Sequence, residues 1–434
     1  MSSQGVIIWL REPFEAHVVQ ELNAQSSKFT VVRRCADITE MEAAVHAGLG
    51  TIIIADADAP GINVESIDRF HARGGFVLLV FADPISAPSL GEDARCGPSD
   101  ASEVIDALTV GLRERILGTE FPAHKPPPPP APENGTAGKT IVVWGTSGAP
   151  GRSTISHNLA HQLARYGLDV TLVDADTRAP SLAQMLGTDL EGSGLATASL
   201  LRQRGGMDTC ALKELRHEID DHLYFLSGLT GSDRWRQLSP ESVCEVIRRL
   251  ADSGHVVVDL CDGLSDGDPS QLTFVPSRED INLDVIRMAD YLLIVSRADA
   301  IGLTRLGQVV NECVELDIAI DLIVVNRVRQ SAAGQHPEQT VQSVLQTICR
   351  HVPRVLIDDC PDVDRAILHG TSVVSVAPKS DYIATINQIL ARLNLADIDS
   401  SREDMSWKKT LRFTRRSVGK RRARHRKHEV GTRR

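Results

Sequence analysis

The stretch that decides the fold runs Thr140-Ile141-Val142-Val143-Trp144-Gly145-Thr146-Ser147-Gly148-Ala149-Pro150-Gly151-Arg152-Ser153-Thr154. Its apolar first part predicts a strand, and the apolar periodicity of residues 155–163 predicts a helix after the glycine-rich turn. A strand, a glycine-rich turn and a Ser/Thr-led helix form a phosphate cradle, because backbone N–H groups and the positive helix end converge there. Arg152 stands where such a loop normally carries lysine. The sequence therefore predicts a P-loop with altered chemistry.

Length and composition limit the class of protein. A chain of 434 residues predicts two or three domains. The longest apolar run, residues 76–82, is far shorter than the ~20 residues that a membrane-spanning helix needs. The start of the chain has neither the basic residues nor the apolar core of a secretory signal. Eight scattered cysteines without a Cys-x-x-Cys pair indicate reduced, mostly buried thiols, so we expect a cytoplasmic protein.

Charge is distributed unevenly along the chain. Residues 408–434 carry thirteen Lys or Arg and one Glu, a net charge of +12. Because the whole chain has a net charge of −10, the remaining residues carry −22. Trp407, Leu411 and Val418 could share one helical face amid these basic residues, which would suit an anionic membrane at its inner face. The run of residues 420–427 would equally suit DNA phosphates, and a solvated or protein-binding tail is the third interpretation.

Changes in composition divide the chain into four parts. Residues 126–130 are five consecutive prolines, followed by an Ala/Gly-containing stretch, and together they predict a spacer with a stiff and a flexible section. We therefore expect a small domain over residues 1–117, a linker over 118–138, a larger domain over 139–396 and the basic tail over 397–434.

The first part predicts a small doubly wound α/β domain with a parallel sheet. Its expected strands cover residues 6–10, 30–33, 51–55 and 76–81, and its expected helices cover 14–22, 38–47, 64–71 and 101–116. This domain resembles a response-regulator receiver, with Asp56 or Asp58 where a phosphoacceptor would lie. That family also needs an acidic pair after the first strand and a lysine near the end of the domain. Arg11-Glu12 and a lone early lysine, Lys28, stand here instead, so the resemblance implies a degenerate receiver that binds a protein partner.

Beyond the linker, aspartates follow several predicted strands. Asp174-Ala175-Asp176 ends one strand, Asp259 ends a second, and Asn326-Arg327 ends a third. Because the carboxyl ends of parallel strands face one crevice, these residues should converge with the cradle. The sequence predicts a mostly parallel, doubly wound sheet with a nucleotide-binding site at this edge.

The requirements of a nucleoside triphosphate suggest a role for each residue. Ser153 can supply a hydroxyl ligand to Mg²⁺, and Asp174 and Asp259 can hold metal-bound waters. Asp176 is the candidate for orienting an attacking water, because phosphoryl transfer depends mostly on positioning and charge. Each aspartate could instead merely cap the helix that follows its strand.

Residues 139–394 resemble the MinD/ParA group of deviant Walker A ATPases. The resemblance rests on the run from Ser147 to Thr154, on residues 158–164, on the Asp-x-Asp at 174–176, on residues 259–263 and 289–295, and on residues 325–328 and 355–358. It implies ATP and Mg²⁺ as cofactors, a nucleotide-dependent homodimer, and a cradle made of Gly148, Ala149, Pro150, Gly151, Arg152, Ser153 and Thr154. It also implies that Asn326 and Arg327 read the base, with residues 355–358 in a loop nearby.

Within that group the chain looks similar to the CpaE/TadZ branch, which pairs a degenerate receiver with a MinD-like ATPase and helps to place pili. The resemblance implies an ATPase that positions pilus machinery, a division site or a chromosome. Ser147 replaces the lysine that reaches the partner's phosphates, and Arg152 replaces the P-loop lysine, so a non-hydrolysing scaffold is the alternative. Residues 174–180 also resemble bacterial tyrosine kinases, but no C-terminal tyrosine cluster is present.

Overall fold

A computed structural model describes residues 3–26, 28–117, 138–148, 150–190, 192–264 and 277–395. The expected linker, apart from Gly138, and the expected tail lie outside these residues. The described chain forms two compact units. Of the described residues, the first unit contains those up to residue 117 together with Ala196–Leu215 and Arg236–Asp252, and the second unit contains the rest. No helix of the described residues is long and apolar enough to cross a membrane.

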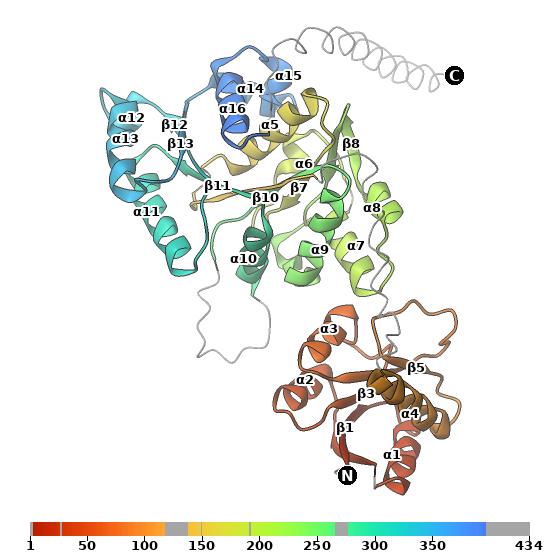
Figure 1. Ribbon diagram of the computed structural model, residues 1–434. Coiled ribbons are helices and arrows are strands. Elements are labelled where there is room, and N and C mark those ends of the chain that lie inside the picture. The colour runs from red at the N-terminus through yellow and green to blue at the C-terminus, as the bar shows by residue number, and fades with distance from the viewer. Residues whose placement is uncertain are drawn as a thin grey trace, which may run out of the picture. The chain divides into compact units, whose positions relative to one another are not determined.

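The first unit contains a five-stranded parallel sheet with the order β2-β1-β3-β4-β5 (Figure 1). Its strands are β1 (Gln4–Trp9), β2 (Phe29–Arg34), β3 (Ile52–Asp56), β4 (Phe76–Val80) and β5 (Ala94–Cys96). Its helices are α1 (Phe14–Ala24), α2 (Ile38–His46), α3 (Val64–Ala72) and α4 (Ala101–Leu117), with α8 (Thr209–Leu215), α9 (Pro240–Ala251) and most of α7 (Gly194–Gln203).

Alternation of side chains along the strands gives this sheet two buried faces. Ile8 and Ile54 belong to one apolar cluster, which includes residues of α1 and α4. Ile7 and Ile53 belong to a second cluster, which includes residues of α2 and α3. Since successive side chains of a strand point to opposite faces, the sheet is covered on both sides, as the βα alternation predicts. The four predicted strands and four predicted helices are confirmed to within about two residues.

The second unit contains an eight-stranded sheet with the order β13-β12-β11-β6-β10-β7-β9-β8. Its strands are β6 (Thr140–Gly145), β7 (Val170–Ala175), β8 (His217–Asp220), β9 (Leu223–Leu226), β10 (His255–Leu260), β11 (Tyr291–Arg297), β12 (Leu322–Val328) and β13 (Arg354–Asp358). Only β8 is antiparallel to its neighbour. The predicted mostly parallel sheet is therefore confirmed.

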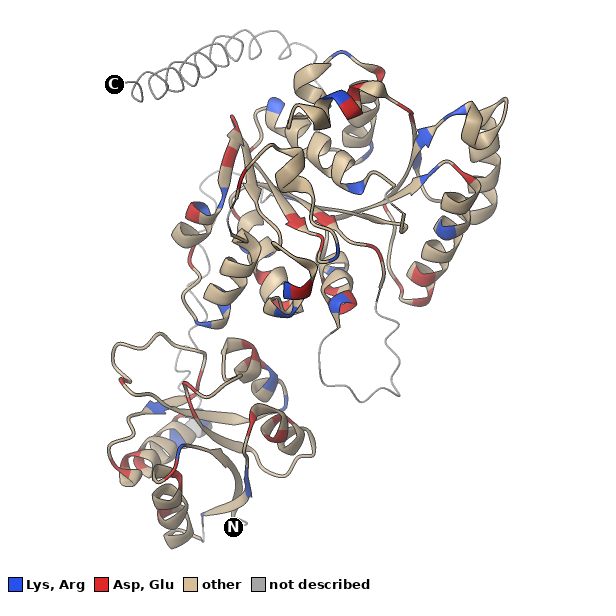
Figure 2. Ribbon diagram, turned by 180° about the vertical axis from the view of Figure 1, so that it is seen from behind, with Lys and Arg blue, Asp and Glu red and all other residues tan. Residues whose placement is uncertain are grey.

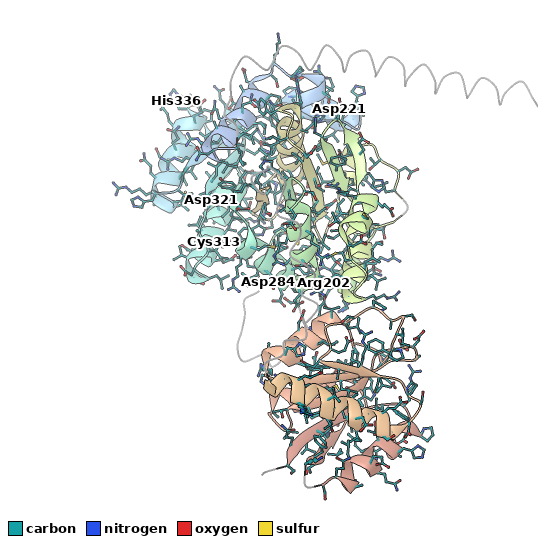
Figure 3. The ribbon with its side chains drawn as sticks, turned by 45° about the vertical axis from the view of Figure 1, so that its right-hand side comes forward. Arg202, Asp221, Asp284, Cys313, Asp321 and His336 are labelled. Atoms are coloured by element: carbon teal, nitrogen blue, oxygen red, sulfur yellow. The ribbon has the colours of Figure 1, made fainter. Side chains whose placement is uncertain are left out.

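The helices of this unit follow the strands in alternation. They are α5 (Arg152–Arg165), α6 (Leu182–Met185), α10 (Arg278–Met288), α11 (Ala300–Glu315), α12 (Gln330–Ala333), α13 (Pro337–Ile348), α14 (Pro361–Leu368), α15 (Val373–Val376) and α16 (Asp381–Arg392), and the short 3₁₀ helix Ser232–Gln237 spans the unit boundary. Figure 3 labels Cys313 on α11 and Asp321 just before β12. Cys313 is buried, and the Asp321 carboxylate accepts a hydrogen bond from the Leu292 N–H of β11, which fixes the end of this crossover.

A continuous core covers one face of the second sheet. It contains alternate strand residues, such as Ile141 and Val143 of β6, together with apolar residues of α5, α15 and α16. Every residue of β6 is buried, as expected for a central strand of a parallel sheet. All eight cysteines are free and six are buried, as the sequence predicts.

The structure adds four strands that the sequence patterns do not reveal. Strands β5, β8 and β9 have only three or four residues, and β8 consists of the largely polar stretch His217–Asp220. Residues 355–358, expected in a loop, instead belong to strand β13 at the edge of the sheet. Strands of three to five residues lack the long apolar run that marks a central strand, so pattern reading misses them.

Candidate functional site

The turn after β6 has the backbone of a phosphate cradle. Gly148 and Gly151 adopt left-handed φ angles of 94° and 100°, and Gly151 directly precedes α5. A Cβ atom on Gly151 would lie 2.3 Å from Nδ2 of Asn326, so the position has room only for glycine. The first N–H groups of α5 have no helical partners, which suits them to an anion. Ala149 lies outside the described residues.

The loop departs from the usual spacing Gly-x-x-x-x-Gly-Lys-[Ser/Thr] at both ends. Thr146 occupies the place of the first glycine and is buried, with its N–H donating to the Val295 carbonyl of β11 at 3.1 Å. Arg152 occupies the place of the lysine. Thr146 thus ties the start of the loop to the neighbouring strand.

Arg152 is held by groups from three loops. Its Nη1 donates to the Thr146 carbonyl at 2.7 Å, and its Nη2 lies 3.9 Å from Asp176 Oδ2 and 3.9 Å from Asp262 Oδ1. Only 11% of the side chain is exposed. The two carboxylates are at the outer limit of an ion pair, so an incoming phosphate could take their place beside the guanidinium.

The hydroxyl residues after Arg152 lie at the start of α5. Ser153 Oγ accepts a hydrogen bond from Ser181 Oγ at 3.3 Å, and Ser156 Oγ donates to Asp259 Oδ1 at 3.0 Å. The Thr154 carbonyl accepts from Asn158 Nδ2 at 2.8 Å, within the same helix. Ser153 is therefore partly exposed beside the predicted carboxylates, while Thr154 takes part in the helix itself.

Two buried carboxyl groups lie side by side behind the loop. Asp174 of β7 and Asp259 of β10 are partners in the register of the sheet and are 1% and 0% exposed. Figure 2 shows acidic segments on neighbouring strands in the centre of this sheet. Burial raises the pKa of Asp259 to about 7, against the opposing effects of the Ser153 hydroxyl and the Arg152 charge. Burial and, next, the Asp259 charge raise the pKa of Asp174 well above its usual range.

The donor set fits Mg²⁺ bound together with phosphates. Asp259 Oδ2 is fully buried and has no hydrogen-bond partner among the described residues, and a buried carboxylate oxygen of this kind is one that a cation or a proton would satisfy. Within the described ranges no group of three or more His, Cys, Asp or Glu side chains could hold a metal alone. Mg²⁺ usually takes one or two protein oxygens and completes its shell with water and phosphate, which is what Ser153, Asp174 and Asp259 could support.

Asp176 has one oxygen engaged and one turned toward the cradle. Oδ1 accepts from the N–H groups of Arg178 and Ala179, both at 2.8 Å, which fixes the turn after β7. Oδ2 lies on the side of Arg152. The carboxylate both shapes this turn and has an oxygen left to face a water or a phosphate.

The predicted base-reading residues have different surroundings. Asn326 Nδ2 donates to the Pro150 carbonyl at 2.9 Å, which joins the end of β12 to the cradle. Arg327 has a left-handed φ of 60°, and its Nε lies 3.1 Å from Asp359 Oδ1. The structure thus brings Asn326 to the cradle and pairs Arg327 with the residue just after β13.

Sequence patterns did not reveal the residues that hold the loop after β10. Asn282 of α10 is fully buried and donates to the Gly263 carbonyl at 2.8 Å and the Cys261 carbonyl at 3.3 Å. The Asp262 carboxylate lies between Arg152 and Arg178, 3.9 Å from each guanidinium. Asn282 carries no motif, so only the folded structure shows that it holds this loop.

Comparison with known proteins finds a matching family and several similar proteins. The family model described as "CobQ/CobB/MinD/ParA nucleotide binding domain" matches residues 141–373. An uncharacterized ATP-binding protein of Methanocaldococcus jannaschii is 23% identical over 259 residues, 58% of this chain and 86% of that protein. The septum site-determining protein MinD of Bacillus subtilis is 23% identical over 259 residues, 59% of this chain and 89% of its own. The crystal structure of a ParA family ATPase from Chlorobium tepidum is 22% identical, with a TM-score of 0.49 over 59% of this chain and 99% of that one.

Proposed function

This chain belongs to the CobQ/CobB/MinD/ParA nucleotide-binding domain family, and on that premise we propose that it binds ATP with Mg²⁺ and uses the nucleotide to position another cellular component. The proposal assigns the loop as a deviant Walker A motif. Arg152 and the N-terminus of α5 would hold the phosphates, Ser153 would reach the metal, and Asp174 and Asp259 would hold its waters. Asn326 and Arg327 would border the base.

The observation that carries this proposal is the convergence of opposite charges around one loop. A guanidinium and a helix N-terminus, both from α5, lie at the same loop as a pair of buried carboxyl groups from β7 and β10. Burying a carboxyl pair is costly unless a proton or cation balances it. Mg²⁺ bound to a polyphosphate would satisfy the carboxylates and Arg152 at the same time.

Hydrolysis would depend on Asp176, with positioning and charge supplying most of the catalysis. The rival is a non-hydrolysing scaffold that binds nucleotide only. Two observations favour that rival: Arg152 replaces lysine, and one Asp176 oxygen is already occupied by backbone N–H groups. Replacement Asp176→Ala should preserve ATP binding and abolish any phosphate release. A parent protein with no phosphate release alone or with partners would support the scaffold.

The first part of the chain would serve as a degenerate receiver that contacts a protein partner. The sheet order β2-β1-β3-β4-β5 is that of flavodoxin-like folds, which supports the assignment. Asp56, at the end of β3, accepts from the Arg11 N–H at 2.9 Å and lies 3.3 Å from its guanidinium. An arginine thus occupies the place where a phosphoreceiver needs acidic metal ligands, so Asp56 would not accept a phosphoryl group.

We also propose partners for this chain. A receiver-like part joined to this family's nucleotide-binding part supports a CpaE/TadZ-like role in placing pilus machinery, with division-site or chromosome placement as the alternatives. The cytoplasmic chain would form a nucleotide-dependent homodimer. The charge of +12 over residues 408–434 supports contact with an anionic membrane or DNA. Deletion of residues 406–434 should then abolish binding to both anionic liposomes and DNA.

Calorimetry with ATP and Mg²⁺ tests the central proposal. Replacement Arg152→Ala should weaken binding by at least about tenfold, since charge-assisted hydrogen bonds contribute about 1.5–3 kcal/mol. Arg392→Ala, at the exposed end of α16, is the matched control and should bind like the parent. Equal affinity in the parent and Arg152→Ala would remove the P-loop assignment.

A further inference from the structure

A second arginine reaches the cradle from α11. This helix follows β11, which pairs with β6 so that Val295 lies opposite Gly145. Its start is fixed twice: Asp299 Oδ1 accepts from the Gly302 N–H at 2.8 Å, and Ser296 Oγ donates to the Gly302 carbonyl at 2.9 Å. The second turn of α11 is therefore held next to the loop that follows β6.

Arg305 on that turn lies against the first half of the cradle. Its Nη1 donates to the Ser147 carbonyl at 3.0 Å. A Cβ atom on Gly148 would come within 2.6 Å of the same Nη1, so the guanidinium lies directly on the glycine backbone. The absence of a side chain at Gly148, as well as its left-handed φ of 94°, makes this close approach possible.

The positive charge of Arg305 is not balanced within the described part of the chain. The arginines near it differ in this respect, because Arg297 lies 2.8 Å from Asp299 and Arg152 faces Asp176 and Asp262. Arg305 has no carboxylate within 4.0 Å among the described residues. A guanidinium has five N–H donors, and only one is committed to the Ser147 carbonyl.

We infer that Arg305 binds the polyphosphate chain of the nucleotide and supplies in cis the cation that the loop lacks at Ser147. The inference rests on the proposed nucleotide binding and extends it to a residue outside the P-loop. The cradle would then hold phosphate between two guanidinium groups, Arg152 at the start of α5 and Arg305 over Ser147-Gly148. Arginine suits this task because its planar fork stays charged and presents several donors to phosphate oxygens.

Calorimetry on Arg305→Gln and Arg305→Lys, with AMP, ADP–Mg²⁺ and ATP–Mg²⁺, tests the inference. Arg305→Gln should lose about tenfold in ATP and ADP affinity, less for AMP, and Arg305→Lys should recover most of the loss. Gln308→Ala, exposed on the same helix, should match the parent. An equal loss of affinity for all three nucleotides would show that Arg305 only shapes the loop, and parental affinity in Arg305→Gln would show that it has no role in binding. Either result would overturn the inference and leave the proposed nucleotide binding in place.

A second measurement uses the parent protein and does not depend on a variant that folds. Phenylglyoxal modifies accessible arginines, and mass spectrometry locates the modified residues. Inorganic tripolyphosphate should protect Arg305 and Arg152 but not the exposed Arg392. Protection of Arg152 alone would overturn the Arg305 inference, and protection of neither would overturn the proposed phosphate site as well.

Discussion

Both units of this protein place acidic residues at the carboxyl ends of parallel strands, but the carboxyl groups at the two sites differ in their partners. At the end of β3, the partly exposed Asp56 is neutralised by Arg11, at 3.3 Å. At the ends of β7 and β10, Asp174 and Asp259 are both buried, and Asp259 Oδ2 has no partner among the described residues.

The comparison shows that fold alone does not make a site. Parallel strands bring polar residues to one edge in both units. A glycine-rich turn with left-handed residues follows the neighbouring strand β6 in the second unit. A buried carboxylate oxygen that has no partner among the described residues, next to a glycine-rich turn at a helix N-terminus, distinguishes this strand end from the one after β3.

The largest expected effect comes from filling the cradle. Gly151→Ala would combine a left-handed φ of 100° with a Cβ only 2.3 Å from Asn326 Nδ2. We expect ATP binding to fall at least about 100-fold and the free energy of unfolding to fall by about 1–3 kcal/mol. Calorimetry and urea unfolding measure the two effects.

Gly167→Ala is the matched control for backbone strain. Gly167 also has a left-handed φ, 80°, but a Cβ there would meet nothing within 4 Å. This variant should lose about 1 kcal/mol of stability and keep its ATP affinity. Equal loss of binding in the two variants would mean that strain, rather than the shape of the cradle, explains the result.

The next effect separates the two carboxylate sites. Asp259→Asn should remove the Mg²⁺-dependent part of ATP binding, whereas Asp56→Asn should leave it intact. Because the pKa of Asp259 is raised to about 7, this carboxyl stays protonated up to a higher pH in the folded state than in the unfolded state. Asp259 therefore lowers the free energy of unfolding as pH rises from about 4 to 7.

Without metal, Asp259→Asn should therefore gain stability over the parent at pH 8 and gain less at pH 5. Thermal unfolding at the two pH values checks the sign. If the stability gained by Asp259→Asn over the parent is smaller at pH 8 than at pH 5, the charge of Asp259 is balanced within the protein and needs no cation.

A smaller effect concerns the helix behind the cradle. Burial, with the neighbouring His161 second, lowers the pKa of His157 in α5 to about 3. As pH falls from about 6.5 toward 3, the unfolded chain gains a proton first, so this group costs up to about 1.4 kcal/mol of stability per pH unit. Lowering the pH from 7.5 to 5 should therefore reduce the free energy of unfolding of the parent more than that of His157→Gln. If the two proteins lose the same stability over this range, His157 is reached by solvent.

The smallest effect is expected in the first unit. Arg11→Ala removes an ion pair whose arginine is 70% exposed, so stability should fall by less than about 1 kcal/mol. Because Lys28 is the only lysine in residues 1–117 and none occurs near the end of this range, incubation with acetyl phosphate and Mg²⁺ should phosphorylate neither the parent nor this variant. A mass increase of one phosphate on Asp56 would make this unit a working phosphoreceiver and would erase the contrast between the two sites.

Sequence patterns predicted the central architecture because its signals are local. The apolar strands β6, β7 and β10, the glycine-rich turn and the aspartates after strands could all be read directly. Arg305 and Asn282 could not be read, because their roles depend on contacts with residues 158 and 19–21 positions away. Strand β13 was missed because it is short and at the sheet edge, where half-exposed residues break the apolar run.

Hydrogen–deuterium exchange with a non-hydrolysable ATP analogue and Mg²⁺ tests the contrast between the two units most directly. We expect slower amide exchange in the loops at residues 146–154, 176–182 and 259–264 of the second unit. We expect no change at residues 56–61 of the first unit, where Asp56 is already paired with Arg11. Unchanged exchange in the three loops, or protection at residues 56–61 instead, would contradict the assignment of the nucleotide to the cradle.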